Sequence, residues 1–214
     1  MKKLALAFIL CSPVFVYGQD NTSSESTSSL SHARPLSKLA VARAQVCAAC
    51  HGAQGISTNP EWPNLAGQNE KYFIKQLNDI KQGSQRQSPT MTAIVATLSP
   101  QDIEELAAFY AQIPHAQGST PQKFLQRGEQ IYRGGDFDKH ITACIACHGP
   151  KGTGNAQAGF PVLSGQHAAY TLMQLRAFKN GKRTNDLNHI MHDICSRMDD
   201  DDMTSVAYYI EGLY

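Results

Sequence analysis

Two copies of a Cys-x-x-Cys-His motif carry the residues best suited to chemistry, at residues 47–51 and at residues 144–148. Two thiols spaced in this way on a helical turn add across the two vinyl groups of one haem, and the adjacent histidine then lies beneath the iron as an axial ligand. The motifs therefore predict two covalently bound haem c groups, with His51 and His148 as proximal iron ligands. The attaching thiols would belong to Cys47, Cys50, Cys144 and Cys147.

Other uses of paired cysteines fit the sequence less well. A zinc ribbon places its two pairs about 15–20 residues apart, far closer than Cys50 and Cys144. A thioredoxin-like redox pair belongs in a strand–helix context and does not need the histidine. Cys195 stands alone and aligns with the apolar Val95. It is predicted to be a buried free thiol, with a disulfide to a partner or to a second protomer as the alternative.

The two motifs belong to a long internal repeat. The segment from Pro63 to Gln68 recurs from Pro161 to Gln166, and Met91 recurs as Met191. Further matching positions are Tyr72 and Tyr170, Gln76 and Gln174, Leu77 and Leu175, and Gly83 and Gly181. Because the landmarks follow the same order in both halves, the sequence predicts a duplicated domain.

The sixth iron ligand determines what each site does, because an open iron binds oxygen or peroxide and a closed one transfers electrons. Met91 is the only methionine between residues 52 and 172, and Met191 takes the equivalent place in the second repeat. A thioether ligand stabilises ferrous iron and raises its potential. The alternative ligands in the second half are His189, His192, Cys195 and Met198.

Two prolines stand at a fixed place in the repeat, shortly after each motif. The carbonyl group of Pro63 or Pro161 is placed to accept a hydrogen bond from the ring N–H of the proximal histidine and so to orient it. The alternative is that these prolines only shape the loop.

The remaining pattern predicts an all-α fold. Apolar residues recur at helical spacing over 68–81 and 166–180, and entry helices are expected over 39–47 and 121–132. Closing helices are expected from Ser99 and from Asp199, each with an N-cap side chain and following carboxylates. The run of acidic residues at 199–202 is therefore interpreted as a capped helix start, rather than as a calcium site or a patch for docking a partner.

The chain divides into four segments. Residues 1–18 read as a cleaved secretory signal, with Lys2 and Lys3 before a short apolar run, and residues 19–37 as a flexible leader rich in Ser and Thr. Retention as an uncleaved or lipid anchor is the alternative. Residues 38–115 and 116–214 would form the two repeated domains. A formal net charge of +1 gives no basic stripe for nucleic acid.

The paired motifs, the Pro-x-Leu-x-Gly-Gln segments, and Met91 and Met191 ahead of the closing helices together resemble the dihaem cytochrome c4 family over residues 37–214. The resemblance implies two tandem class I cytochrome c domains, related by a pseudo-twofold axis, with His/Met-ligated haem and propionate edges facing across the interface. It also implies a periplasmic location, with peripheral membrane association in some members. By the same resemblance, electrons would pass from a cytochrome bc complex to a haem-copper terminal oxidase.

Three functions are compatible with these residues. The leading one is an electron carrier without substrate chemistry of its own, since the two expected sites are closed and no other catalytic constellation is apparent. The second is the electron-accepting cytochrome subunit of a dehydrogenase, such as a flavin enzyme that oxidises sulfide. The third is a two-haem enzyme, such as a peroxidase, which would need an open or switchable iron.

Overall fold

The structure is a computed structural model, and it describes residues 38–214. The predicted signal and leader, residues 1–37, lie outside the described residues. Over residues 38–214 the chain forms helices and isolated bridges but no strand, which confirms the expected all-α class. None of the helices in this range is both long enough and apolar enough to span a membrane.

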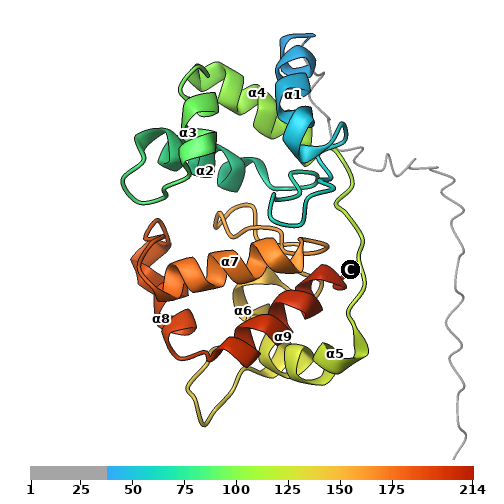
Figure 1. Cartoon of the computed structure of the whole chain (residues 1–214), viewed down its shortest axis with the longest axis vertical. Helices are drawn as coiled ribbons and strands as arrows, with labels where there is room; N and C mark the ends of the chain where they lie inside the picture. The colour runs from blue at the N-terminus through green and yellow to red at the C-terminus, as the bar shows by residue number, and fades with distance from the viewer. Residues whose placement is uncertain (1–37) are drawn as a thin grey trace, which may run out of the picture. The chain divides into compact units, whose positions relative to one another are not determined.

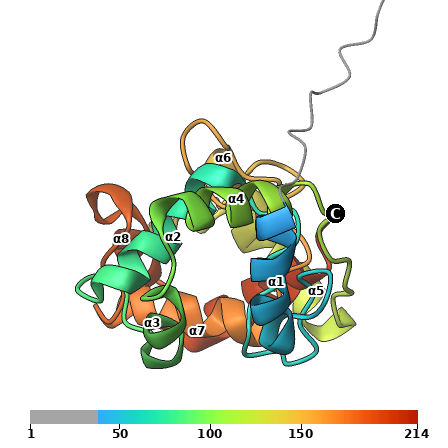
Figure 2. The same ribbon diagram turned by 90° about the horizontal axis from the view of Figure 1, so that it is seen from above.

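The first group of helices contains the first motif (Figure 1). Its elements are α1 (Lys38–His51), α2 (Glu70–Gln82), α3 (Pro89–Val95) and α4 (Pro100–Ala111). Helix α1 packs against α4, and α2 packs against both α3 and α4 (Figures 1 and 2). The core that these helices enclose includes Phe73, whose ring stacks on Tyr110 with 5.6 Å between centroids. We call this group the first lobe.

The second group of helices repeats this arrangement around the second motif, and we call it the second lobe. Its elements are α5 (Gln122–Glu129), η1 (Gln130–Gly134), α6 (Ile145–His148), α7 (Ala168–Lys179), η2 (Leu187–His189), α8 (Ile190–Ser196) and α9 (Asp200–Glu211). Helix α5 packs against α9, and α7 packs against α8 and α9. The lobe has a separate core, in which Tyr132 lies against Tyr209. Both lobes belong to one compact unit.

The lobes differ where the entry helix meets the motif. In the first lobe the expected helix over 39–47 extends to His51, so that the motif lies in α1 itself. In the second lobe the helix expected over 121–132 is found as α5, which ends at Glu129. The π-helical turn η1 follows it directly. A loop follows, closed by a bridge between Asp136 and Ile141, and the second motif forms the separate short helix α6.

Capping sets the ends of the remaining helices. Helix α2 begins at Glu70 because the Asn69 side chain accepts a hydrogen bond from the backbone N–H of Tyr72, and it ends at Gly83 with φ of 72°. The expected helix over 166–180 is found as α7. Sequence periodicity did not predict α3 and α8, which are one to two turns long and place Met91 and Met191.

The interpretation of residues 199–202 as a helix start agrees with the structure. The Asp199 side chain accepts from the backbone N–H of Asp202, and the Asp202 carboxylate accepts from the backbone N–H of Asp199, which forms a capping box. The hydrogen bond from Lys139 is the largest influence on Asp199 and lowers its pKa to about 2. No cluster of acidic residues within 38–214 has the arrangement of a metal site.

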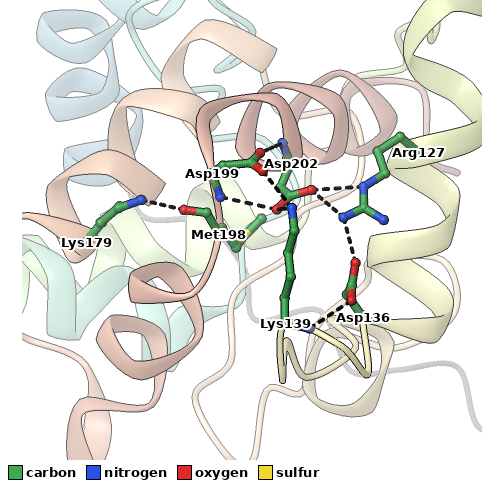
Figure 3. Close-up of polar contacts among 7 residues, drawn as sticks. All are labelled: Arg127, Asp136, Lys139, Lys179, Met198, Asp199 and Asp202. Atoms are coloured by element: carbon green, nitrogen blue, oxygen red, sulfur yellow. Dashed lines mark hydrogen bonds and ion pairs between the residues drawn. The ribbon is translucent and has the colours of Figure 1, made fainter.

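Asp202 also connects the entry and closing helices of the second lobe (Figure 3). Its buried carboxylate accepts hydrogen bonds from Arg127 on α5, with Nε at 2.9 Å, and from Lys139 at 2.7 Å. In the first lobe the equivalent pair is Arg43 on α1 and Asp102 on α4, at 3.2 Å. In each lobe an arginine and a buried aspartate thus hold the entry helix against the closing helix.

The segment between the lobes packs against the repeated glycines. Gly67 and Gly165 both adopt positive φ, of 72° and 67°. A Cβ atom on Gly67 would lie 2.8 Å from His115 Cβ, and one on Gly165 would lie 1.8 Å from the carbonyl oxygen of Ala116. The glycine of each Pro-x-Leu-x-Gly-Gln segment is therefore required both by the turn and by the close approach of the connecting chain.

Candidate functional site

All eight residues of the predicted haem sites line one continuous cavity of about 1760 Å³. They are Cys47, Cys50, His51, Met91, Cys144, Cys147, His148 and Met191. A pocket for a single drug-sized ligand occupies about 300–1,000 Å³. The larger volume, and the presence of both motifs on its wall, fit two bulky cofactors rather than one.

The two motif histidines are held in the same way. His51 Nδ1 lies 2.8 Å from the carbonyl oxygen of Pro63, and His148 Nδ1 lies 3.1 Å from that of Pro161. Of the two roles considered for the prolines, the geometry favours that of hydrogen-bond acceptor. Burial lowers the pKa of both histidines, partly offset by this hydrogen bond, so the neutral ring that binds metals is favoured. The Nδ1 contact fixes each ring and leaves Nε2 as the nitrogen for a ligand.

None of the five cysteines within residues 38–214 forms a disulfide with another of them, so the four motif thiols are available to attach haem. Burial raises the pKa of Cys47, and it raises that of Cys144 to about 12, so both thiols are neutral near pH 7. Cys195 is fully buried in the core of the second lobe, as Val95 is in the first. The prediction of a buried free thiol at Cys195 therefore agrees with the structure.

The two methionines of the repeat occupy equivalent positions. Met91 on α3 and Met191 on α8 are half-buried, and each packs against the core of its own lobe. Among the alternatives in the second lobe, only Met198 also lines the cavity. His192 is engaged through Nδ1 with the carbonyl oxygen of Phe178 at 2.8 Å, and His189 is exposed.

Two buried polar atoms on the cavity wall have no hydrogen-bond partner within the described residues, Thr171 Oγ1 and Asp186 Oδ1. Unpartnered buried polar atoms are rare in proteins and indicate a missing partner. A haem propionate is a hydrogen-bond acceptor, so it would supply a partner for the Thr171 hydroxyl but not for the carboxylate oxygen of Asp186. At Thr171 the cavity wall therefore fits haem. Sequence reasoning missed both atoms, and Thr171 occupies the repeat position of the apolar Phe73.

The repeated Gly-Gln segments join the lobes. The Gln166 amide donates to the Asn64 carbonyl at 2.9 Å and accepts from the Asn64 backbone N–H at 2.9 Å. The Gln68 amide makes the same pair of hydrogen bonds with the backbone of Val162, at 3.0 and 2.9 Å. Gln166 thus contacts the residue after Pro63, and Gln68 contacts the residue after Pro161. Both contacts lie next to a proline whose carbonyl group orients a motif histidine. Sequence analysis recognised the repeat but not this reciprocal pairing.

Comparison with known proteins gives the family. The model of the cytochrome c family matches residues 39–113 and 125–213. Cytochrome c4 of Stutzerimonas stutzeri is 40% identical over 194 residues, which cover 86% of this chain and 92% of that protein. This chain belongs to the cytochrome c4 family. Cytochrome c4 of Pseudomonas aeruginosa is 42% identical over 186 residues, with the same coverage of both chains.

Solved structures agree with this family. The crystal structure of reduced recombinant cytochrome c4 from Pseudomonas stutzeri matches with a TM-score of 0.79 and 41% identity, covering 82% of this chain and 97% of that one. The cytochrome c4 assignment confirms the two tandem cytochrome c domains and the two covalently bound haem c groups. It also makes the protein a dihaem electron carrier rather than an enzyme.

Proposed function

We propose that this cytochrome c4 is a periplasmic shuttle that takes single electrons from a cytochrome bc complex and delivers them to a haem-copper terminal oxidase. The observation that carries the proposal is the repeated pairing, in one cavity, of a proline-oriented histidine with a methionine from a short helix. An iron held by both side chains would have no open position, which favours electron transfer over substrate binding.

The roles of the individual residues follow from their positions. Cys47 and Cys50 attach the first haem, with His51 and Met91 as its iron ligands. The second lobe repeats this set with Cys144, Cys147, His148 and Met191. Bound haem supplies a ferric/ferrous couple that exchanges one electron at a time.

The protein contributes rigidity and exclusion of water. The carbonyls of Pro63 and Pro161 hold the imidazoles, and the arginine–aspartate pairs at Asp102 and Asp202 hold each entry helix against its closing helix. The largely apolar cavity wall would exclude water from a bound haem and so limit rearrangement around it on oxidation and reduction. A small structural change on oxidation and reduction is what a fast carrier needs.

A second function is favoured by one comparison. The thiosulfate dehydrogenase electron acceptor of Stutzerimonas stutzeri is 37% identical over 174 residues, covering 79% of this chain and 80% of that protein. In this second function, the protein would accept electrons from a periplasmic dehydrogenase. The identity is lower than that to the cytochrome c4 proteins.

The two functions are separated by supplying each donor in turn to the purified holoprotein. Ferric protein is mixed with a quinol and a cytochrome bc complex, or with thiosulfate and a thiosulfate dehydrogenase, and reduction is followed optically. Membranes containing a haem-copper oxidase are then added to the reduced protein. Rapid quinol-dependent reduction followed by oxidase-dependent reoxidation supports the shuttle. Reduction by the dehydrogenase alone would replace the shuttle by the second function.

Rapid binding of carbon monoxide by the reduced protein would show an open iron. It would contradict both electron-carrier proposals and favour a two-haem enzyme.

A further inference from the structure

The short helices that carry the two methionines are placed alike in the two lobes. Residues 91–98 and 191–198 have the same order of buried, half-buried and exposed positions, although only Met91 and Ile94 keep their identity in the second lobe. Helices α3 and α8 are each seven residues long. A helix of this length is marginal in isolation, so contacts with the rest of the lobe must determine where it lies.

In the first lobe, hydrogen bonds join α3 and the chain after it to the last turn of α2. The Thr92 hydroxyl lies 3.2 Å from the carbonyl oxygen of Ile80, and it also lies 2.9 Å from that of Ser88, the residue before α3. In the other direction, the ammonium group of Lys81 donates to the carbonyl of Leu98. The segment with the methionine is therefore fastened to α2 at two points, one within α3 and one beyond its end.

The second lobe makes the same two connections with a different side chain. His192, at the repeat position of Thr92, contacts the carbonyl oxygen of Phe178 through Nδ1 at 2.8 Å. Because a carbonyl group only accepts, Nδ1 carries the proton in this contact. Lys179 donates to the carbonyl of Met198 (Figure 3). The segment with the second methionine is thus fastened to the last turn of α7.

The feature common to the two lobes is the hydrogen bond itself. A hydroxyl and an imidazole differ in size and shape, but Thr92 and His192 both donate at this point. Their acceptors, Ile80 and Phe178, are among the last four residues of α2 and α7. The carbonyl groups of these positions have no i+4 partner within the helix and can accept from outside it.

The donors do not contact the haem cavity themselves. Met91 and Met191 line its wall. Four donors do not line it: Thr92, His192, Lys81 and Lys179. A change at one of them would therefore reach a bound haem through the position of the short helix.

We infer that Thr92 and His192 are positioning residues for the methionine that precedes each of them. Together with the lysine of the preceding long helix, each holds the short helix so that the methionine sulfur stays at the iron when an external ligand competes for it. Groups that orient metal ligands in this way tune the metal site without touching the metal. The inference rests on the proposed function, because it takes Met91 and Met191 as iron ligands, but it requires no particular redox partner.

The test is a titration of the ferric holoprotein with imidazole, which binds the iron only after the methionine has left it. Thr92→Val removes the donor, and Thr92→Ser keeps it. Breaking the hydrogen bond is part of the cost of release in the wild type but not in T92V. The apparent binding constant of imidazole at the first haem should therefore rise about fivefold in T92V, which corresponds to the net contribution of one hydrogen bond. T92S should stay close to the wild type, and the second haem should be unchanged in both.

Two further variants extend the test to the other donors. His192→Leu removes the donor of the second lobe, whereas His192→Asn keeps an N–H group near the place of Nδ1. H192L should raise the imidazole binding constant about fivefold at the second haem alone, and H192N should recover most of this change. Lys81→Met keeps the length of the side chain without the ammonium group. It should raise the constant at the first haem, and it keeps the inference falsifiable if T92V fails to fold.

The matched control is Thr97→Val. The Thr97 hydroxyl is exposed and donates to the carbonyl of Ile94 at 2.9 Å, within the same turn of chain rather than to α2. T97V loses the same group as T92V, and its imidazole binding should stay at the wild-type value. Equal increases in T92V and T97V, an increase at both haems in T92V, or no increase in T92V would overturn the positioning role.

Met91→Ala and Met191→Ala assign the two phases of the titration, because each opens one iron. They also separate this inference from the proposed function. If M91A removes the long-wavelength band of the first ferric haem while T92V binds imidazole as the wild type does, only the positioning role fails. If M91A leaves that band unchanged, Met91 is not a ligand, and the proposed function loses its site together with this inference.

Discussion

Replacing Asp202 by Asn should destabilise the second lobe strongly. Asp202 is 1% exposed, and its carboxylate accepts hydrogen bonds from Arg127, from Lys139 and from the backbone of Asp199 (Figure 3). Asn keeps the size of the side chain but removes the charge, so that both cations lose their buried partner. Each cation retains one other carboxylate, since Arg127 also contacts Asp136 and Lys139 also contacts Asp199.

The expected cost follows from these contacts. Breaking a fully buried ion pair by removing one partner costs about 3–5 kcal/mol. The Arg127 side chain is 29% exposed and keeps Asp136, so the loss should be smaller. Weakening the capping box adds to it, because N-terminal capping interactions contribute about 1 kcal/mol. We expect D202N to lower the free energy of unfolding of the second lobe by about 2–3 kcal/mol.

The measurement is urea unfolding of the holoprotein followed by circular dichroism and by haem absorption. The matched control is Asp200→Asn, two residues earlier in α9, where the carboxylate is exposed and pairs with the exposed Arg176. Its cost should stay below about 1 kcal/mol. The equivalent first-lobe variant, D102N, should lose less than D202N, because a single, more exposed arginine contacts Asp102. Equal losses in D202N and D200N would refute the reasoning.

Three further predictions concern single side chains. Met191→Ala should remove the long-wavelength band of Met-ligated ferric haem from one of the two sites, whereas Met198→Ala should keep both contributions; the optical spectrum of the ferric protein decides between them. Cys195→Val should change the free energy of unfolding by less than about 1.5 kcal/mol, because Val95 fills the equivalent position in the first lobe; a larger loss by thermal unfolding would show that the two cores differ there. Asp199 has its pKa lowered from 3.8 to about 2, mainly by the hydrogen bond from Lys139. Its contribution to stability is therefore present above pH 4 and is lost as the pH falls to 2. Lys139→Gln should make the loss of stability over this range shallower in acid titrations.

The parts of the site that depend on local chemistry could be predicted from the sequence. The Cys-x-x-Cys-His spacing indicates haem attachment on its own, and the repeat selects Met91 and Met191 without knowledge of the fold. The closing helices were predictable because a side-chain cap and the carboxylates after it are local signals, at Ser99 as at Asp199. The order of the helices followed from the same patterns.

Features that depend on contacts between the lobes could not be predicted. Gln68 and Gln166 were visible as a repeat, but their hydrogen bonds to backbone groups about a hundred residues away arise only in the folded chain. The same holds for the hydrogen bonds that Arg86 and Arg183 donate across the contact between the lobes, to the hydroxyls of Tyr170 and Tyr72. The short helix α6 was also missed, because the loop that Asp136 and Ile141 close separates it from the entry helix.

The most direct test of the whole account is an optical redox titration of the purified holoprotein together with a count of its haems. The account predicts two haems per chain and a ferric spectrum with the methionine band in the amount expected for two sites. It also predicts that Met91→Ala removes half of that band. One haem per chain or none, or an unchanged spectrum in M91A, would contradict the claim that each iron is held between a histidine and a methionine.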